Sequence, residues 1–177
     1  MKKIFYVKTN DCKSTRETLQ KILFSKFAIE NPMVEKSENG KPYLSQTGET
    51  PLHFSISHTD ELTFFVFSDK NVGVDAEKLT RKVEYAPIIK KFKEEERAEI
   101  LSKTEFLRHW TAKESAVKWL GGRLGKDLNS LQFVKNELYY KCVPLPIYVC
   151  FFEFEEHIVA ICGENDFSGA QIEQFLE

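Results

Sequence analysis

Two acidic residues stand on one face of a short expected strand, and this is the first sign of chemistry in the sequence. Segment 72–77 (VGVDAE) alternates, so a strand there would carry apolar residues on one side and Asp75 and Glu77 on the other. Two carboxylates this close repel each other unless a cation or solvent lies between them. A solvent-exposed edge face is the alternative explanation.

A third carboxylate falls on the apolar face of the helix that we expect at 104–120. Glu114 lies seven residues after Leu107 and four after Trp110, so it points with the apolar stripe. Lys118, four residues further on, shares this face. On a surface such a pair is worth only ~0.3–0.5 kcal/mol. Buried, it would cost several kcal/mol per ion unless it had strong partners.

A site that collects Asp75, Glu77 and Glu114 would explain both patterns. Three oxygen ligands suit a hard cation such as Mg²⁺, which completes its shell with water and phosphate oxygens. Lys118 and Lys113 would then face the negative charge of the phosphate.

A candidate anion site lies at 54–59 (FSISHT). His58 follows the end of an alternating strand, between the hydroxyls of Ser57 and Thr59. Hydroxyls, exposed backbone N–H groups and an imidazole together suit an anion. A histidine in a turn is more often plain surface, which stays the alternative here.

Composition narrows the class of protein. The chain has 177 residues, 42% hydrophobic with 15 Phe, which indicates one domain with a sizeable core. Lys+Arg 25 against Asp+Glu 27 gives a net charge of −2, which argues against nucleic-acid binding through bulk positive charge. The sequence has no apolar run near the ~20 residues of a membrane helix and no secretion signal. The four cysteines have neither CxxC nor zinc-type spacing. We expect a cytoplasmic protein with free thiols and no membrane or nucleic-acid partner.

Mixed strands and segregated helices predict an α+β fold. In the first part of the chain we expect a strand at 3–7, a helix from a capping box at Ser14 and Glu17 to about residue 30, and turns at 37–50. Strands at 53–57, 62–68 and 71–77 follow, and then helices within 85–121 with a break at 102–104. A β-meander at 131–162 and a short helix at 168–176 complete the expected elements.

Ordered segments of this chain resemble the signature elements of the 4'-phosphopantetheinyl transferases, of the longer type similar to the surfactin synthetase activator. These segments are 39–42 (NGKP), 54–59 (FSISHT), 72–77 (VGVDAE), 92–96 (FKEEE) and 110–118 (WTAKESAVK). Segment 147–163 also looks like the closing hairpin of the family. The order and the intervals make the resemblance specific, although each segment alone is weak.

The resemblance implies that the 4'-phosphopantetheine arm of coenzyme A is transferred to a serine of an acyl or peptidyl carrier protein, with release of 3',5'-ADP. It implies Asp75, Glu77 and Glu114 as Mg²⁺ ligands, Glu114 as the candidate general base, and Lys118 as a contact of the pyrophosphate. The further contacts that it implies are a phosphate contact at Lys113 and an adenosine 3'-phosphate region at Lys41, Ser57, His58 and Thr59. Glu96 matches an acidic residue whose role stays open.

Two departures from the family pattern concern the nucleotide end of coenzyme A. The basic segment that longer relatives carry before the first helix has no counterpart between the expected strand and helix. Binding of the adenosine end of coenzyme A would then depend more on Lys41 and His58. Arg123 stands where glycine is common in the family. It either adds a phosphate or carrier contact or reflects only a changed turn.

In architecture, the resemblance implies two similar α+β halves, about 1–70 and 71–177, related by a pseudo-twofold axis, with coenzyme A between them. The join would lie near Asp69–Asn71, and the length favours a monomer. A metal-dependent phosphodiesterase and a non-catalytic module that binds coenzyme A or a carrier protein are the alternative functions.

Overall fold

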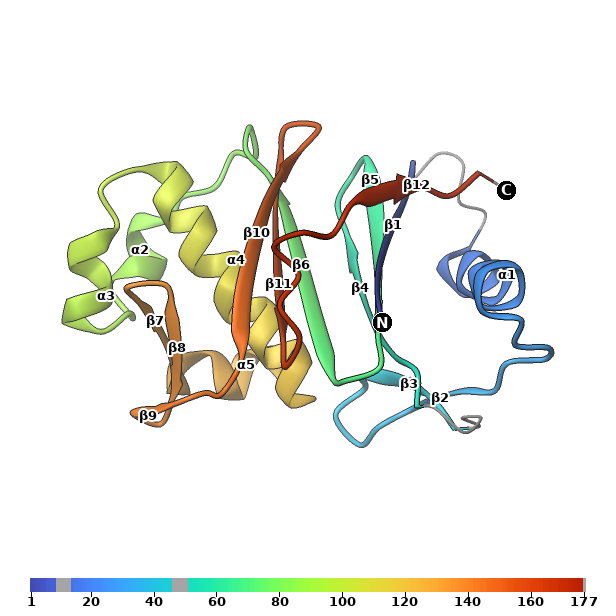
Figure 1. Cartoon of the computed structure of the whole chain (residues 1–177). Helices are drawn as coiled ribbons and strands as arrows, with labels where there is room; N and C mark the ends of the chain where they lie inside the picture. Colours follow the sequence, from blue (N-terminus) through green and yellow to red (C-terminus); the bar gives the residue numbers. More distant parts are fainter. Residues whose placement is uncertain (9–13, 46–50, 177) are drawn as a thin grey trace.

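The computed structural model describes residues 1–8, 14–45 and 51–176, and it shows a mixed α+β fold (Figure 1). Cys12 and the end of the expected 37–50 turn region lie outside these ranges. The helices within them are all too short or too polar to cross a lipid bilayer. The elements are β1 (Lys2–Lys8), α1 (Thr15–Phe27), β2 (Val34–Lys36), β3 (Pro42–Leu44), β4 (His53–His58), β5 (Leu62–Ser68), β6 (Val72–Lys78), α2 (Ala86–Ile89), α3 (Glu94–Glu99), α4 (Lys103–Leu120), α5 (Leu124–Asp127), the 3-10 turn η2 (Leu128–Ser130), β7 (Leu131–Val134), β8 (Glu137–Tyr140), β9 (Val143–Pro144), β10 (Tyr148–Phe154), β11 (His157–Gly163) and β12 (Ile172–Gln174).

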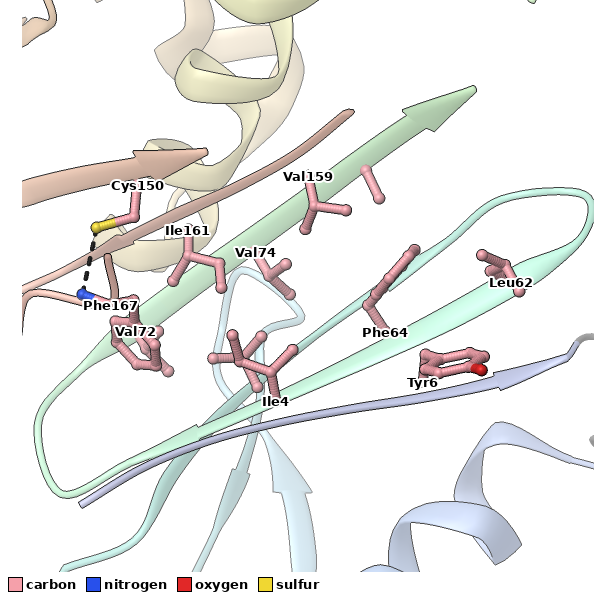
Figure 2. Packing of buried hydrophobic residues seen from close by; sticks show 12 residues of the cluster. Ile4, Tyr6, Leu62, Phe64, Val72, Val74, Cys150, Val159, Ile161 and Phe167 are labelled. Carbon is pink, nitrogen blue, oxygen red and sulfur yellow. Dashed lines mark hydrogen bonds between the residues drawn. The ribbon is translucent and has the colours of Figure 1, made fainter. Parts of the chain in front are cut away.

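Two sheets pack face to face at the centre of the molecule. Their strand orders are β12-β1-β5-β4 and β10-β11-β6. Helix α1 covers the outer face of the first sheet and α4 covers the outer face of the second (Figure 1). Figure 2 shows Val74 and Ile161 of the second sheet facing Ile4 and Phe64 of the first. These buried side chains form the core that holds the two layers together.

Helix α4 begins and ends where the sequence indicates. The side chain of Ser102 accepts a hydrogen bond from the backbone N–H of Glu105 (3.2 Å), and Gly121 ends the helix in the left-handed conformation (φ 66°). Helix α1 begins in the same way, because Ser14 accepts from the backbone N–H of Glu17 (3.1 Å). The predicted starts of both helices are confirmed.

Strand β6 lies directly beneath α4, and Gly73 makes this possible. A Cβ atom on Gly73 would collide with the backbone oxygen of Ser115 and the backbone nitrogen of Trp119. Asp75, the next residue on the same face, is therefore covered and only 4% exposed. The alternative of a solvent-exposed edge face is wrong for this strand.

The expected meander at 131–162 is divided between two sheets, which corrects the sequence prediction. Strands β7, β8 and β9 form a small sheet of their own, whereas β10 and β11 join β6. Strand β11 is buried along its whole length, as a central strand. Its register places Ala160 opposite Asp75, so the acidic strand pairs with the middle of the sheet.

The expected closing helix at 168–176 is also wrong. Strand β12 lies there instead, parallel to β1, with Ile172 opposite Ile4. The backbone N–H of Phe175 then donates to the carbonyl oxygen of Tyr6 (2.9 Å). Periodicity does not separate strand from helix in so short a segment, and the free edge of β1 decides in favour of the strand.

The close approach of β6 and α4 can be tested at Gly73. We expect Gly73→Ala to lower the free energy of unfolding by about 1–3 kcal/mol or more, because the helix backbone must move away from the strand. Gly125→Ala is the matched control, since an added Cβ there meets no atom within 4 Å. Urea unfolding of both variants measures the difference. Equal stability of the two variants would show that β6 does not need the glycine.

Candidate active site

The site is built on the outer edge of β6. This strand pairs with β11 on one side, and on the other side its backbone N–H groups bond to hydroxyls of β4. The N–H of Val74 donates to Ser55 Oγ (3.0 Å), and that of Ala76 donates to Ser57 Oγ (3.1 Å). Ser57 in turn donates its proton to Asp75 Oδ1 (3.1 Å). The two serines therefore join the two sheets and orient the first acidic residue.

Lysines bind the carbonyl groups on this same edge. Lys118 Nζ donates to the carbonyl oxygen of Val74 (2.8 Å) and to Asp75 Oδ1 (2.9 Å). Lys41 Nζ donates to the carbonyl oxygen of Val72 (3.2 Å). The edge thus brings Lys118 from α4, a predicted site residue, into contact with Asp75.

Three carboxylates influence each other at this point. Burial, reinforced by the charges of Asp75 and Glu77, raises the pKa of Glu114 to about 8 against the opposing charges of Lys118 and Arg81. Burial also raises the pKa of Glu77, and the charge of Asp75 adds to this. The predicted acidic residues are therefore electrostatic neighbours, and burial is the main cause of the raised pKa of Glu114 and Glu77.

The donor set fits a hard cation. Asp75 Oδ2 is buried and has no hydrogen-bond partner among the described residues, while Glu77 is ion-paired with Arg81. In the part of the chain that the structure describes, no three His, Cys, Asp or Glu side chains are gathered in a ligating arrangement. The oxygen-only donors, their excess negative charge and the unpartnered oxygen nevertheless match what Mg²⁺ prefers.

His58 lies near the cluster, whereas Thr59 serves the turn. Burial and the nearby charge of Lys118 lower the pKa of His58, whose Nε2 lies 2.8 Å from Thr15 Oγ1. Thr59 Oγ1 accepts from backbone N–H groups of the β4–β5 turn and lies 3.1 Å from Nε2 of His157. Of the predicted 57–59 anion site, the structure brings the histidine beside Lys118.

Lys41 is an internal tie between α4 and β6. Its ammonium lies 2.7 Å from Asn71 Oδ1, 3.2 Å from the oxygen of Val72 and 3.4 Å from that of Trp119. An ammonium has three N–H donors, so each of them has an acceptor within the protein. Burial lowers the pKa of Lys41 to about 8. This is where the structure places the lysine for which the resemblance implies a contact with the adenosine 3'-phosphate.

Lys113, for which the resemblance implies a phosphate contact, is buried beneath α3 and β7. Its side chain is 2% exposed. Its Nζ donates to Glu96 Oε2 (3.0 Å) and lies 3.7 Å from the centre of the Phe92 ring. Adjacent helix residues point ~100° apart, so Lys113 faces away from Glu114. Glu96 also accepts from the backbone N–H of Phe133 (3.3 Å). The pair therefore ties α3 and β7 to α4.

Hollows adjoin the cluster at Glu77 and at Lys118. The first has a volume of about 750 Å³ and is also lined by His58 and Arg81. The second, of about 370 Å³, also touches Arg123. A substrate group can therefore approach Glu77 from the first hollow and Lys118 from the second.

Two site residues were missed by the reasoning from sequence. Arg81 follows Glu77 by four residues, a spacing that indicates a pair only within a helix, whereas here the chain runs from the end of β6 into a turn. Ser55 shares its strand face with Ser57, and alternation alone could have indicated that both face a neighbouring element.

Comparison with known proteins agrees with this geometry. Residues 71–162, from β6 to β11, match the family model of the 4'-phosphopantetheinyl transferase superfamily. "4'-Phosphopantetheinyl transferase gsp" of Aneurinibacillus migulanus is 30% identical over 145 residues, which are 75% of this chain and 58% of that protein. "L-aminoadipate-semialdehyde dehydrogenase-phosphopantetheinyl transferase" of Xenopus laevis is 29% identical over 147 residues, 71% of this chain and 49% of that protein. The chain thus spans about half the length of these curated relatives.

The matched segment contains β6, α4 and β11, and with them the acidic residues and Lys118. The resemblance seen in the sequence is confirmed, and the chain belongs to the 4'-phosphopantetheinyl transferase superfamily.

Proposed function

We propose that this protein transfers the 4'-phosphopantetheine arm of coenzyme A to a serine of an acyl or peptidyl carrier protein, as a Mg²⁺-dependent enzyme of the holo-[acyl-carrier-protein] synthase type. The observation that carries this proposal is the contact of Lys118 with Asp75 beside the half-buried Glu114. The names of the relatives support it. We further propose that the enzyme acts as a cytoplasmic monomer, with coenzyme A between pseudo-symmetric halves at about 1–70 and 71–177.

In this reaction the serine oxygen forms a bond to the β-phosphorus of coenzyme A. The bond from that phosphorus to the oxygen of the 3',5'-ADP group breaks, and the leaving oxygen keeps the electron pair. The serine proton passes to the carboxylate of Glu114. A base with a pKa raised toward neutrality is suited to this step, because a general base works best near the operating pH.

Lys118 is the residue best placed to stabilise the leaving group. Its ammonium makes two bonds within the protein, to Val74 and Asp75, and its side chain is 27% exposed. One donor therefore remains for a phosphate oxygen. Asp75, Glu77 and Glu114 would hold Mg²⁺, which would neutralise phosphate charge and favour the ionised form of Glu114.

The proposed contacts of coenzyme A divide into two groups. Lys118 and His58 stay as direct contacts. Ser57, Thr59, Lys41 and Lys113 act as supports, because their polar atoms already bond to Asp75, to a turn, to β6 and to Glu96.

The function is tested by mixing the protein with coenzyme A, Mg²⁺ and an apo carrier protein. We expect the carrier to gain the mass of one phosphopantetheine arm. Cleavage of added nucleic acid without this gain would instead identify a phosphodiesterase. Binding of coenzyme A with neither reaction would identify a non-catalytic module.

Changes at the carboxylates test the assignment of the site. We expect Asp75→Asn and Glu114→Gln each to reduce transfer by about 100-fold or more, the usual effect of removing a general base or an essential charge. Glu94→Gln on the exposed face of α3 is the matched control and should keep normal transfer. Mass spectrometry of the carrier measures the rates. Near-normal turnover of either site variant at saturating Mg²⁺ would contradict the assignment.

Glu114→Gln should also stabilise the metal-free protein. The folded-state pKa of Glu114 is raised to about 8, so its ionisation in the unfolded chain removes stability as the pH rises from about 4.5 to 8. A neutral glutamine removes this loss. We expect a gain of at least about 1 kcal/mol, or 2–4 °C in Tm, at pH 8 and almost none at pH 4.5. Thermal unfolding in a chelator measures both. A Tm that is unchanged at pH 8 would show that Glu114 is not desolvated.

A further inference from the structure

The hollow beside Lys118 has the lining of a nucleoside phosphate site. Its apolar wall comes from Phe54, Ile56 and Pro42, and its basic groups include Lys118 and Arg123. None of the described residues that line it is Asp or Glu. In a chain with a net charge of −2, this is a local excess of positive charge next to an apolar surface.

The lysines of this hollow are largely occupied. Each N–H donor of Lys41 has an acceptor on Asn71, β6 or α4, as described above. Two N–H donors of Lys118 bond to Val74 and Asp75 of β6. Neither lysine is therefore free to provide more than a single bond to a ligand.

Arg123 is different, because it is exposed and still has donors. Its guanidinium donates to the carbonyl oxygen of Glu38 (3.2 Å), and a guanidinium carries five N–H groups. The backbone around it is held in place. The backbone N–H of Arg123 donates to Asp127 Oδ2 (2.8 Å), and Asn39 Nδ2 donates to the carbonyl oxygen of Gly121 (2.8 Å). Arg123 is thus positioned at the hollow, and its guanidinium keeps N–H groups for a ligand.

Arg123 and Lys118 are anchored on different elements. Lys118 is held by β6 beside Asp75, whereas Arg123 is held by the turn between β2 and β3. The nucleotide of coenzyme A carries its pyrophosphate at the 5' position and a separate phosphate at the 3' position. Both cations line the same hollow, so a ligand whose pyrophosphate lies at Lys118 can present its second phosphate to Arg123.

We propose that Arg123 binds the 3'-phosphate of coenzyme A and makes this enzyme select coenzyme A over dephospho-coenzyme A, an inference that rests on the proposed function. A planar guanidinium forms paired hydrogen bonds to a phosphate, which a lysine cannot do. In this role Arg123 takes the place of Lys41, one of the residues for which the resemblance implies the same contact.

The test compares ligands that differ only in the 3'-phosphate. Binding of 3',5'-ADP and of 5'-AMP is measured by calorimetry in a chelator, so that the result does not depend on a metal ion. We expect Arg123→Gln to weaken 3',5'-ADP by about 10-fold or more, the usual value of a charge-assisted hydrogen bond. Binding of 5'-AMP should change less than twofold. Arg123→Lys should fall between the wild type and Arg123→Gln.

Arg97→Gln is the matched control, because Arg97 lies exposed on α3 and the substitution removes the same charge. It should change neither affinity. An equal loss of both ligands in Arg123→Gln, or no loss of either, would overturn the inference. So would a wild-type protein that binds 3',5'-ADP no better than 5'-AMP. Selective binding that depends on Arg123, without transfer to any carrier protein, would leave the inference standing and refute the proposed function.

Discussion

The outer edge of β6 is the constraint on which the site depends. An exposed strand edge must satisfy its backbone groups, and here side chains rather than another strand do so. Hydroxyls from β4 accept from the N–H groups of Val74 and Ala76, and ammonium groups donate to the carbonyl groups of Val72 and Val74. In this arrangement side chains take the place of a further strand at the edge, and the end of β6 at Glu77 and Lys78 lines a hollow.

The same contacts balance the charge of the acidic residues. Lys118 is ion-paired with Asp75 and Arg81 with Glu77, and burial raises the pKa of Glu114 to about 8. A proton therefore resides preferentially on Glu114 in the metal-free protein. The residue that we propose as the proton acceptor is thus one whose proton affinity the fold raises, through the close packing of α4 on β6.

Local patterns predicted much of this arrangement, and tertiary contacts decided the rest. Alternation in 72–77 predicted that Asp75 and Glu77 share a face, and the position of Glu114 on an apolar stripe predicted a partly buried acid. The hydrogen bonds of Lys41 and Lys113 could not be predicted from such patterns, because each lysine bonds to groups distant in the chain. The prediction of a helix at 168–176 was wrong for a similar reason, since the strand found there depends on pairing with β1.

The distribution of cations explains why a departure from the family pattern is informative at Arg123. A lysine whose donors all have acceptors within the protein stabilises the fold and has little left to offer a ligand. An arginine held through one donor at the edge of the hollow keeps its remaining donors in a fixed orientation. In this chain the motif lysine at 41 bonds to β6, and Arg123, outside the motif, lines the same hollow with most of its N–H groups unspent on the protein.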